Sequence, residues 1–94
     1  MKNDKFFFSN AVFKEEKGYS SLCLDLDVAS QGRTIAEAKK NLLEAIELYL
    51  ETTIESNLTY LRPVPAAEDP RRNEIDNCVE IFDLKVAFSF KAHA

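Results

Sequence analysis

The chain has 94 residues, 46% hydrophobic and 30% charged, which is typical of one globular domain over residues 1–94. Its formal charge of −4, from 16 acidic and 12 basic residues, disfavours a nucleic-acid-binding protein, because such binding depends on neutralising phosphates. Cys23 and Cys78 lack the number and spacing of a disulfide scaffold or a metal site, so no cofactor is expected. No signal peptide and no membrane-spanning apolar run is visible, and the sequence predicts a cytoplasmic protein with reduced thiols.

The first third of the chain predicts a β-hairpin. Residues 6–15 are rich in aromatic and β-branched side chains, which favour a strand, and Gly18 suits the turn that follows. Residues 20–28 alternate with a period of two, which indicates a second strand with one buried face. We expect Leu22, Leu24, Leu26 and Val28 to face the core, and Ser21, Cys23, Asp25 and Asp27 to face the opposite side. A tight turn containing Gly32 follows, with a very short third strand over residues 30–32.

A long amphipathic helix is predicted from Thr34 to about residue 56. Thr34 and Glu37 have the T-x-x-E spacing of a capping box, in which each side chain bonds a free backbone N–H at the start of the helix. Apolar residues then recur at spacings of three and four, the pattern of a helix with one core face. The core face is expected to hold Ile35, Ala38, Leu42, Ala45, Ile46 and Tyr49.

All three prolines lie between Pro63 and Pro70, so residues 62–77 are predicted to form a loop. Residues 78–90 then alternate again and predict a last strand. The fold class is therefore α+β, with a small antiparallel sheet, one long helix packed on a face of it, and the order β-β-β-α-β.

The ordered combination of three motifs is similar to the HicB-like antitoxin domain family. Gly18-Tyr19 opens the second strand, and an S-x-G-x-T turn precedes the helix at Ser30, Gly32 and Thr34. The helix then reads E-A-x-x-N-L-x-E-A-I-E-x-Y from Glu37 to Tyr49. The resemblance covers about residues 13–51. Where many members carry a P-E-L-P-G segment, this chain has LDLDVA at residues 24–29.

The resemblance implies a partial RNase H-like fold and a function as an antitoxin. Such a protein would bind a small basic HicA-like ribonuclease, an mRNA interferase, and block it sterically without chemistry of its own. Many members continue into a DNA-binding module, but no such module is recognisable up to Ala94, so direct DNA binding is not expected. The alternative is an orphan HicB-like module that forms homo-oligomers and has no toxin partner.

Acidic residues are the candidate contacts to a basic partner. Asp25 and Asp27 share the polar face of the predicted second strand, and the helix carries Glu44, Glu47 and Glu51. The ordinary interpretation of the helix carboxylates is a solvated surface. The two aspartates could also begin a metal site of a nuclease, although a two-metal site needs further carboxylates that the sequence does not identify.

The remaining candidates point to structure or self-association. His93 lies too near the chain end to be held as a catalytic base. Gly18 and Gly32 are explained by turns, and Leu42 and Ile46 by the core. Phe6, Phe7 and Phe8 are consecutive and cannot all face one side of a strand. Either the long loop covers an edge there or, because edge strands pair readily, the edge forms a subunit interface. We expect a homo-oligomer, either a dimer or a tetramer.

Overall fold

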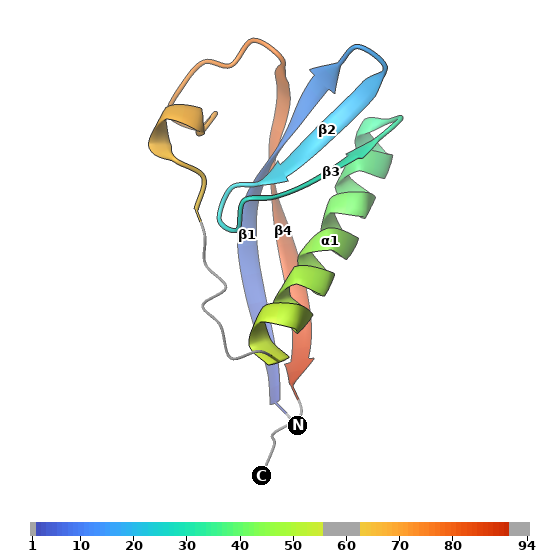
Figure 1. Ribbon diagram of the computed structural model, residues 1–94, viewed down its shortest axis with the longest axis vertical. Helices are drawn as coiled ribbons and strands as arrows, with labels where there is room; N and C mark the ends of the chain where they lie inside the picture. Colours follow the sequence, from blue (N-terminus) through green and yellow to red (C-terminus); the bar gives the residue numbers. More distant parts are fainter. Residues whose placement is uncertain (1, 56–62, 91–94) are drawn as a thin grey trace.

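The computed structural model describes the backbone of residues 2–55 and 63–90, and the side chains of residues 7–53 and 63–86. The elements within these ranges are β1 (Lys2–Glu15), β2 (Gly18–Cys23), β3 (Val28–Gly32), α1 (Ile35–Glu55), the 3-10 helix η1 (Ala66–Glu68) and β4 (Cys78–Phe90). The strands form one antiparallel sheet in the order β3-β2-β1-β4, and α1 lies across one face of it (Figure 1). The predicted α+β class and the order β-β-β-α-β are confirmed.

β1 is an inner strand of this sheet. It pairs with β4 along almost its whole length, but with β2 only from Asn10 to Glu15. β1 lies between β2 and β4 in the strand order, but residues 6–8 pair with β4 alone, so this part of β1 has no strand neighbour on the β2 side. Neighbouring residues of a strand point to opposite faces, and accordingly Phe8 is buried whereas Phe7 is 69% exposed.

The core lies between α1 and the sheet face that it covers. Leu42, Ile46 and Leu50 follow one side of α1 at a spacing of four residues and are fully buried. Burial of each such side chain contributes about 1.5–3 kcal/mol to folding. Their partners come from all parts of the sheet and the turn after β2: Phe8, Cys23, Leu26 and Val86, with Tyr49 and Phe82 partly buried at the margin.

β2 differs from the prediction in its length and in its buried face. The strand ends at Cys23, and residues 24–27 form a turn. Ser21 and Cys23 are buried on the side of α1, where the Ser21 hydroxyl donates a hydrogen bond of 2.9 Å to the Ala38 carbonyl. Leu22 is half-buried on the opposite face. The predicted apolar and polar faces of this strand were therefore interchanged.

The turn also separates the two leucines that follow β2. Leu26 joins the cluster beneath α1, whereas Leu24 packs on the opposite face of the sheet with Ala11 and Val64. A turn does not maintain the two-residue alternation of a strand, so the regular spacing of these leucines in the sequence gave a misleading strand pattern.

The start of α1 is fixed by side-chain caps and by a close approach to β3. Thr34 Oγ1 accepts a hydrogen bond from the Glu37 backbone N–H at 3.0 Å, and Glu37 Oε1 accepts one from the Arg33 N–H at 3.2 Å. A Cβ atom added at Gly32 would lie 2.4 Å from the Ala38 nitrogen. Gly18 has a φ of +147°, which favours glycine in the β1–β2 turn.

The loop between α1 and β4 covers part of the other sheet face. The Val64 N–H donates to the Leu24 carbonyl at 2.9 Å, and the Lys14 N–H donates to the Asn77 carbonyl at 2.7 Å. Val64 is buried against Ala11. The two ends of the described loop are thus attached near the hairpin, and among the described residues the loop covers only this part of the sheet face.

The α1 packing predicts that Leu42→Asp unfolds the protein. The substitution removes a fully buried side chain and places a charge in the core, a loss of several kcal/mol relative to a total stability of about 5–15 kcal/mol. Leu48→Asp is the matched control, because Leu48 lies on the same helix but is 65% exposed. Circular dichroism during urea denaturation should show no folded baseline for Leu42→Asp and a near wild-type midpoint for Leu48→Asp. Equal effects of the two substitutions would contradict this packing.

Candidate protein-binding surface

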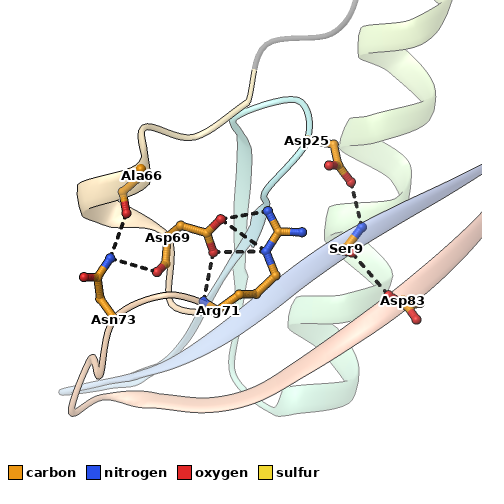
Figure 2. A network of polar contacts seen from close by, with 7 residues as sticks. All are labelled: Ser9, Asp25, Ala66, Asp69, Arg71, Asn73 and Asp83. Atoms are coloured by element: carbon orange, nitrogen blue, oxygen red, sulfur yellow. Dashed lines mark hydrogen bonds and ion pairs between the residues drawn. The ribbon is translucent and has the colours of Figure 1, made fainter.

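Asp25 has a structural contact that the sequence does not reveal. It is half-buried in the turn after β2, and its Oδ2 accepts a hydrogen bond from the Ser9 backbone N–H at 2.8 Å (Figure 2). The Leu24 N–H donates to the Ser9 carbonyl at 2.8 Å. The pairing of β1 with β2 stops next to Ser9. The Asp25 carboxylate therefore accepts a hydrogen bond from the Ser9 N–H, which would otherwise be unpaired at an open strand edge.

Asp27 lies in the same turn and is exposed, with a φ of 53°. The expectation that Asp25 and Asp27 leave one face of a strand is wrong, because neither residue belongs to a strand. Among the described residues, no group of three or more His, Cys, Asp or Glu side chains is placed to hold a metal ion.

The three helix carboxylates form a separate acidic group. Glu44, Glu47 and Glu51 are exposed on the side of α1 that faces away from the buried stripe. Asp25 instead lies next to Ser9 on β1 and faces the loop that carries Arg71 (Figure 2). The structure therefore does not join the five predicted acidic residues into one patch.

Asp69 and Arg71 form an ion pair that the sequence analysis missed. Asp69 is buried, and its Oδ2 accepts a hydrogen bond from Arg71 Nη2 at 2.7 Å, while its Oδ1 accepts from the Arg71 backbone N–H at 2.9 Å. Asn73 Nδ2 adds a hydrogen bond to the Ala66 carbonyl (Figure 2). The Arg71 side chain lowers the pKa of Asp69 through this hydrogen bonding. The D-P-R motif at residues 69–71 was the available signal, since aspartate readily bonds the backbone two residues ahead.

The uncovered part of the sheet carries exposed apolar side chains. Phe7, Val79 and Ile81 are 69%, 47% and 46% exposed. The register pairs Phe7 with Lys85, Ser9 with Asp83, and Ala11 with Ile81, so these residues share the face opposite α1. Lys85 Nζ lies 5.9 Å from the centre of the Phe7 ring. We call the set Phe7, Ile81, Asp83 and Lys85 the open-face patch. Apolar side chains next to charges of both signs suit a protein partner.

A second surface feature is an open hollow of about 470 Å³ between the β1–β2 turn, β3 and the start of α1. Its lining carries charges of both signs, including Glu15, Lys17, Arg33 and Glu37. Glu15 already accepts a hydrogen bond from Ser20 at 2.7 Å, and Glu37 belongs to the helix cap. The carboxylates of Glu15 and Glu37 therefore have structural partners.

The two cysteines differ in their surroundings. Cys23 is fully buried in the core, and burial raises the pKa of its thiol to about 11, whereas Cys78 is half-buried. In the part of the chain that the structure describes, no helix is long and apolar enough to cross a bilayer. His93 lies outside the described residues.

The burial of Cys23 predicts that the two thiols react at different rates. With a pKa of about 11, on the order of one Cys23 thiol in a thousand is ionised at pH 8, and the core also blocks access. A thiol-specific reagent should label Cys78 first and Cys23 only when urea unfolds the chain. In Cys78→Ala the fast labelling should disappear. Fast labelling of both thiols in the folded protein would be inconsistent with this core.

The Asp69–Arg71 pair predicts an acid-dependent stability term. The pKa of Asp69 is lower in the folded state than in the unfolded state, where it is about 3.9. The stabilisation is therefore complete above that value and is lost as the pH falls through the folded pKa. Asp69→Asn should lower the free energy of unfolding by about 1 kcal/mol at pH 7, and the difference from wild type should shrink below about pH 4. Asp76→Asn, at an exposed carboxylate of the same loop, is the control. Denaturation curves that give a constant difference between pH 7 and pH 3 would refute this assignment.

Comparison with known proteins identifies the fold. No protein-family model and no curated protein matches the chain. The N-terminal domain of the antitoxin HicB from Burkholderia pseudomallei matches with a TM-score of 0.58 and 28% identity, over 93% of this chain and 100% of that chain. A chain of the HicA3 and HicB3 toxin–antitoxin complex matches with a TM-score of 0.57 and 20% identity, also over 93% and 100%. Together with the motifs of residues 13–51, these similarities show that the chain has the fold of the HicB N-terminal domain.

Proposed function

We propose that this chain is an antitoxin that binds a small basic ribonuclease of the HicA type and blocks it sterically. The observation that best supports this proposal is the match, over 93% of the chain, to the N-terminal domain of the antitoxin HicB. A solved complex of HicA3 and HicB3 supplies a precedent for a toxin partner. Residues 1–94 would act as one HicB-like unit that contacts protein rather than DNA and has no catalytic activity of its own.

The acidic side of α1 is the proposed contact surface for this partner. Glu44, Glu47 and Glu51 are exposed on successive turns, so their charges add along one side of the helix. A ribonuclease binds RNA phosphates through positively charged side chains. A row of carboxylates can bind the same positively charged surface and exclude the RNA. Asp27 is a candidate at the margin, whereas one oxygen of Asp25 is already engaged by Ser9.

A second candidate function is the orphan module that assembles with its own copies and has no toxin. The observation that favours it is the open-face patch. Exposed apolar side chains on a sheet face can bind a second copy of the chain as well as a different protein. Recovery experiments distinguish the two candidates.

The first test is a pull-down of the tagged chain from its native cells, read by mass spectrometry. We expect a small basic protein that arrests growth when it is expressed alone and that becomes harmless when it is co-expressed with this chain. Recovery of only the chain itself would refute the antitoxin proposal and favour the orphan module.

The acidic contact surface predicts the effect of charge reversal on that complex. The triple variant Glu44→Lys, Glu47→Lys, Glu51→Lys should weaken toxin binding by at least about tenfold, because attraction across the interface becomes repulsion. The matched control is Glu16→Lys, Glu68→Lys, Glu74→Lys, which changes the net charge equally at exposed residues away from α1. Titration calorimetry at fixed salt should show a loss only for the helix variant. Equal losses would mean that net charge alone matters, and that the helix is not the contact.

A further inference from the structure

One large apolar side chain of α1 points away from the core. Leu48 is 65% exposed, whereas the core residues of the same helix are fully buried. The other large apolar side chains that are exposed among the described residues are Phe7, Val79 and Ile81, and all three belong to the sheet. Leu48 is therefore the apolar part of the outer side of α1, and it contributes little to the packing of the domain.

Carboxylates lie next to Leu48 on the helix surface. Residues three and four apart along a helix are neighbours, so Glu44 and Glu51 lie on either side of Leu48 along α1. Glu47 is in turn a neighbour of both of these glutamates, and all three carboxylates are exposed. Among the described residues, none of the three belongs to an ion pair. We call Leu48, Glu44, Glu47 and Glu51 the α1 outer patch.

The charges of this patch do not stabilise the helix. Residues 44–55 contain four glutamates and no lysine or arginine, and the last turn of α1 has no basic residue. The C-terminal end of a helix carries a partial negative charge, which favours basic side chains there. Glu47 also repels Glu44 and Glu51, because like charges three or four residues apart destabilise a helix. Arrangements that break a local rule in this way are expected at functional surfaces.

The charge of the patch indicates the chemistry of its partner. Nucleic acids and anionic membrane surfaces are negatively charged, so a row of carboxylates repels both. A second copy of α1 would bring the same glutamates opposite this row, which disfavours self-association through the helix. The open-face patch, in contrast, carries one charge of each sign, at Asp83 and Lys85. The occupant that fits the α1 outer patch is a different protein with a basic surface.

We propose that Leu48 is the apolar anchor of a docking surface for a basic protein, and that it enters an apolar pocket surrounded by lysine or arginine side chains. The inference rests on the proposed antitoxin function, and it names the residue that determines how long the ribonuclease stays bound. Apolar side chains that lose contact with water on binding carry much of the affinity of an interface, whereas the charges around them accelerate encounter. The anchor therefore controls dissociation, and the carboxylates control association.

Binding kinetics separate these two roles. The probe is the small basic ribonuclease recovered with the chain, and both rate constants are measured at low and at physiological salt. Leu48→Ala should raise the dissociation rate constant at least about tenfold and leave the association rate constant and its salt dependence unchanged. The neutral variant Glu44→Gln, Glu47→Gln, Glu51→Gln should instead associate about tenfold more slowly at low salt and show a smaller salt dependence.

Phe7→Ala is the matched control for the anchor. Phe7 is 69% exposed, close to the value for Leu48, but it lies on the sheet face opposite α1. This variant should bind the ribonuclease with the rate constants of wild type. Circular dichroism should show the same fold for both alanine variants, because both side chains are exposed and alanine is the most favourable residue in a helix.

Thiol protection tests the location of the contact independently. In a Cys78→Ala background, Leu48→Cys should react rapidly with a thiol reagent in the free chain and at least about tenfold more slowly in the complex. Phe7→Cys in the same background should react equally fast with and without the ribonuclease.

The outcomes distinguish the failure of the anchor from the failure of the antitoxin proposal. If wild type neither binds nor inhibits a basic ribonuclease, the antitoxin proposal fails and the anchor fails with it. If wild type inhibits the ribonuclease and Leu48→Ala dissociates as slowly as wild type, only the anchor is wrong. Weaker binding by Phe7→Ala, or thiol protection at residue 7 instead of residue 48, would also overturn the anchor and would place the partner on the opposite sheet face.

Discussion

The packing of α1 on one face of the sheet is the constraint on which the rest of the structure depends. Leu42, Ile46 and Leu50 contribute the buried side of the helix, and the sheet contributes Phe8 and Val86 from its two longest strands. Among the described residues, the other sheet face carries a smaller cluster of Ala11, Leu24 and Val64 and also exposes Phe7 and Ile81. Helix packing therefore determines both the stability of the domain and the location of its free surfaces.

The free surfaces differ in chemistry. The outer side of α1 is acidic through Glu44, Glu47 and Glu51, whereas the opposite sheet face exposes Phe7 and Ile81 beside a charged strand. An acidic helix suits a basic partner, and exposed apolar side chains beside charges suit a protein partner. The acidic residues of α1 and the open-face patch lie on opposite sides of the sheet.

The sequence predicted those elements whose local signals agree with their tertiary environment. Thr34 and Glu37 marked the start of α1 because a helix cap is a local structure, and residues 78–90 kept their alternation because β4 is a continuous strand. The faces of β2 were predicted wrongly. The turn at residues 24–27 is not visible in the spacing of the leucines, and Ser21 is buried because its hydroxyl bonds the Ala38 carbonyl.

The five acidic candidate contacts stay a prediction. Their grouping depends on tertiary structure, which separates Asp25 from the helix carboxylates and uses its carboxylate to accept a hydrogen bond from the Ser9 N–H. The exposure of Phe7 and Val79 likewise depends on which part of the sheet the loop from residue 63 covers. A linear pattern of charges and apolar residues does not contain that information.

The most direct test of the antitoxin account is the stoichiometry of inhibition. Purified chain would be added to the small basic protein recovered with it, and RNA cleavage would be measured at a toxin concentration well above the dissociation constant. The account predicts that cleavage falls linearly with added chain and is abolished at a fixed stoichiometric ratio, as expected for steric cover of the active surface. Undiminished cleavage in the presence of bound chain would contradict it.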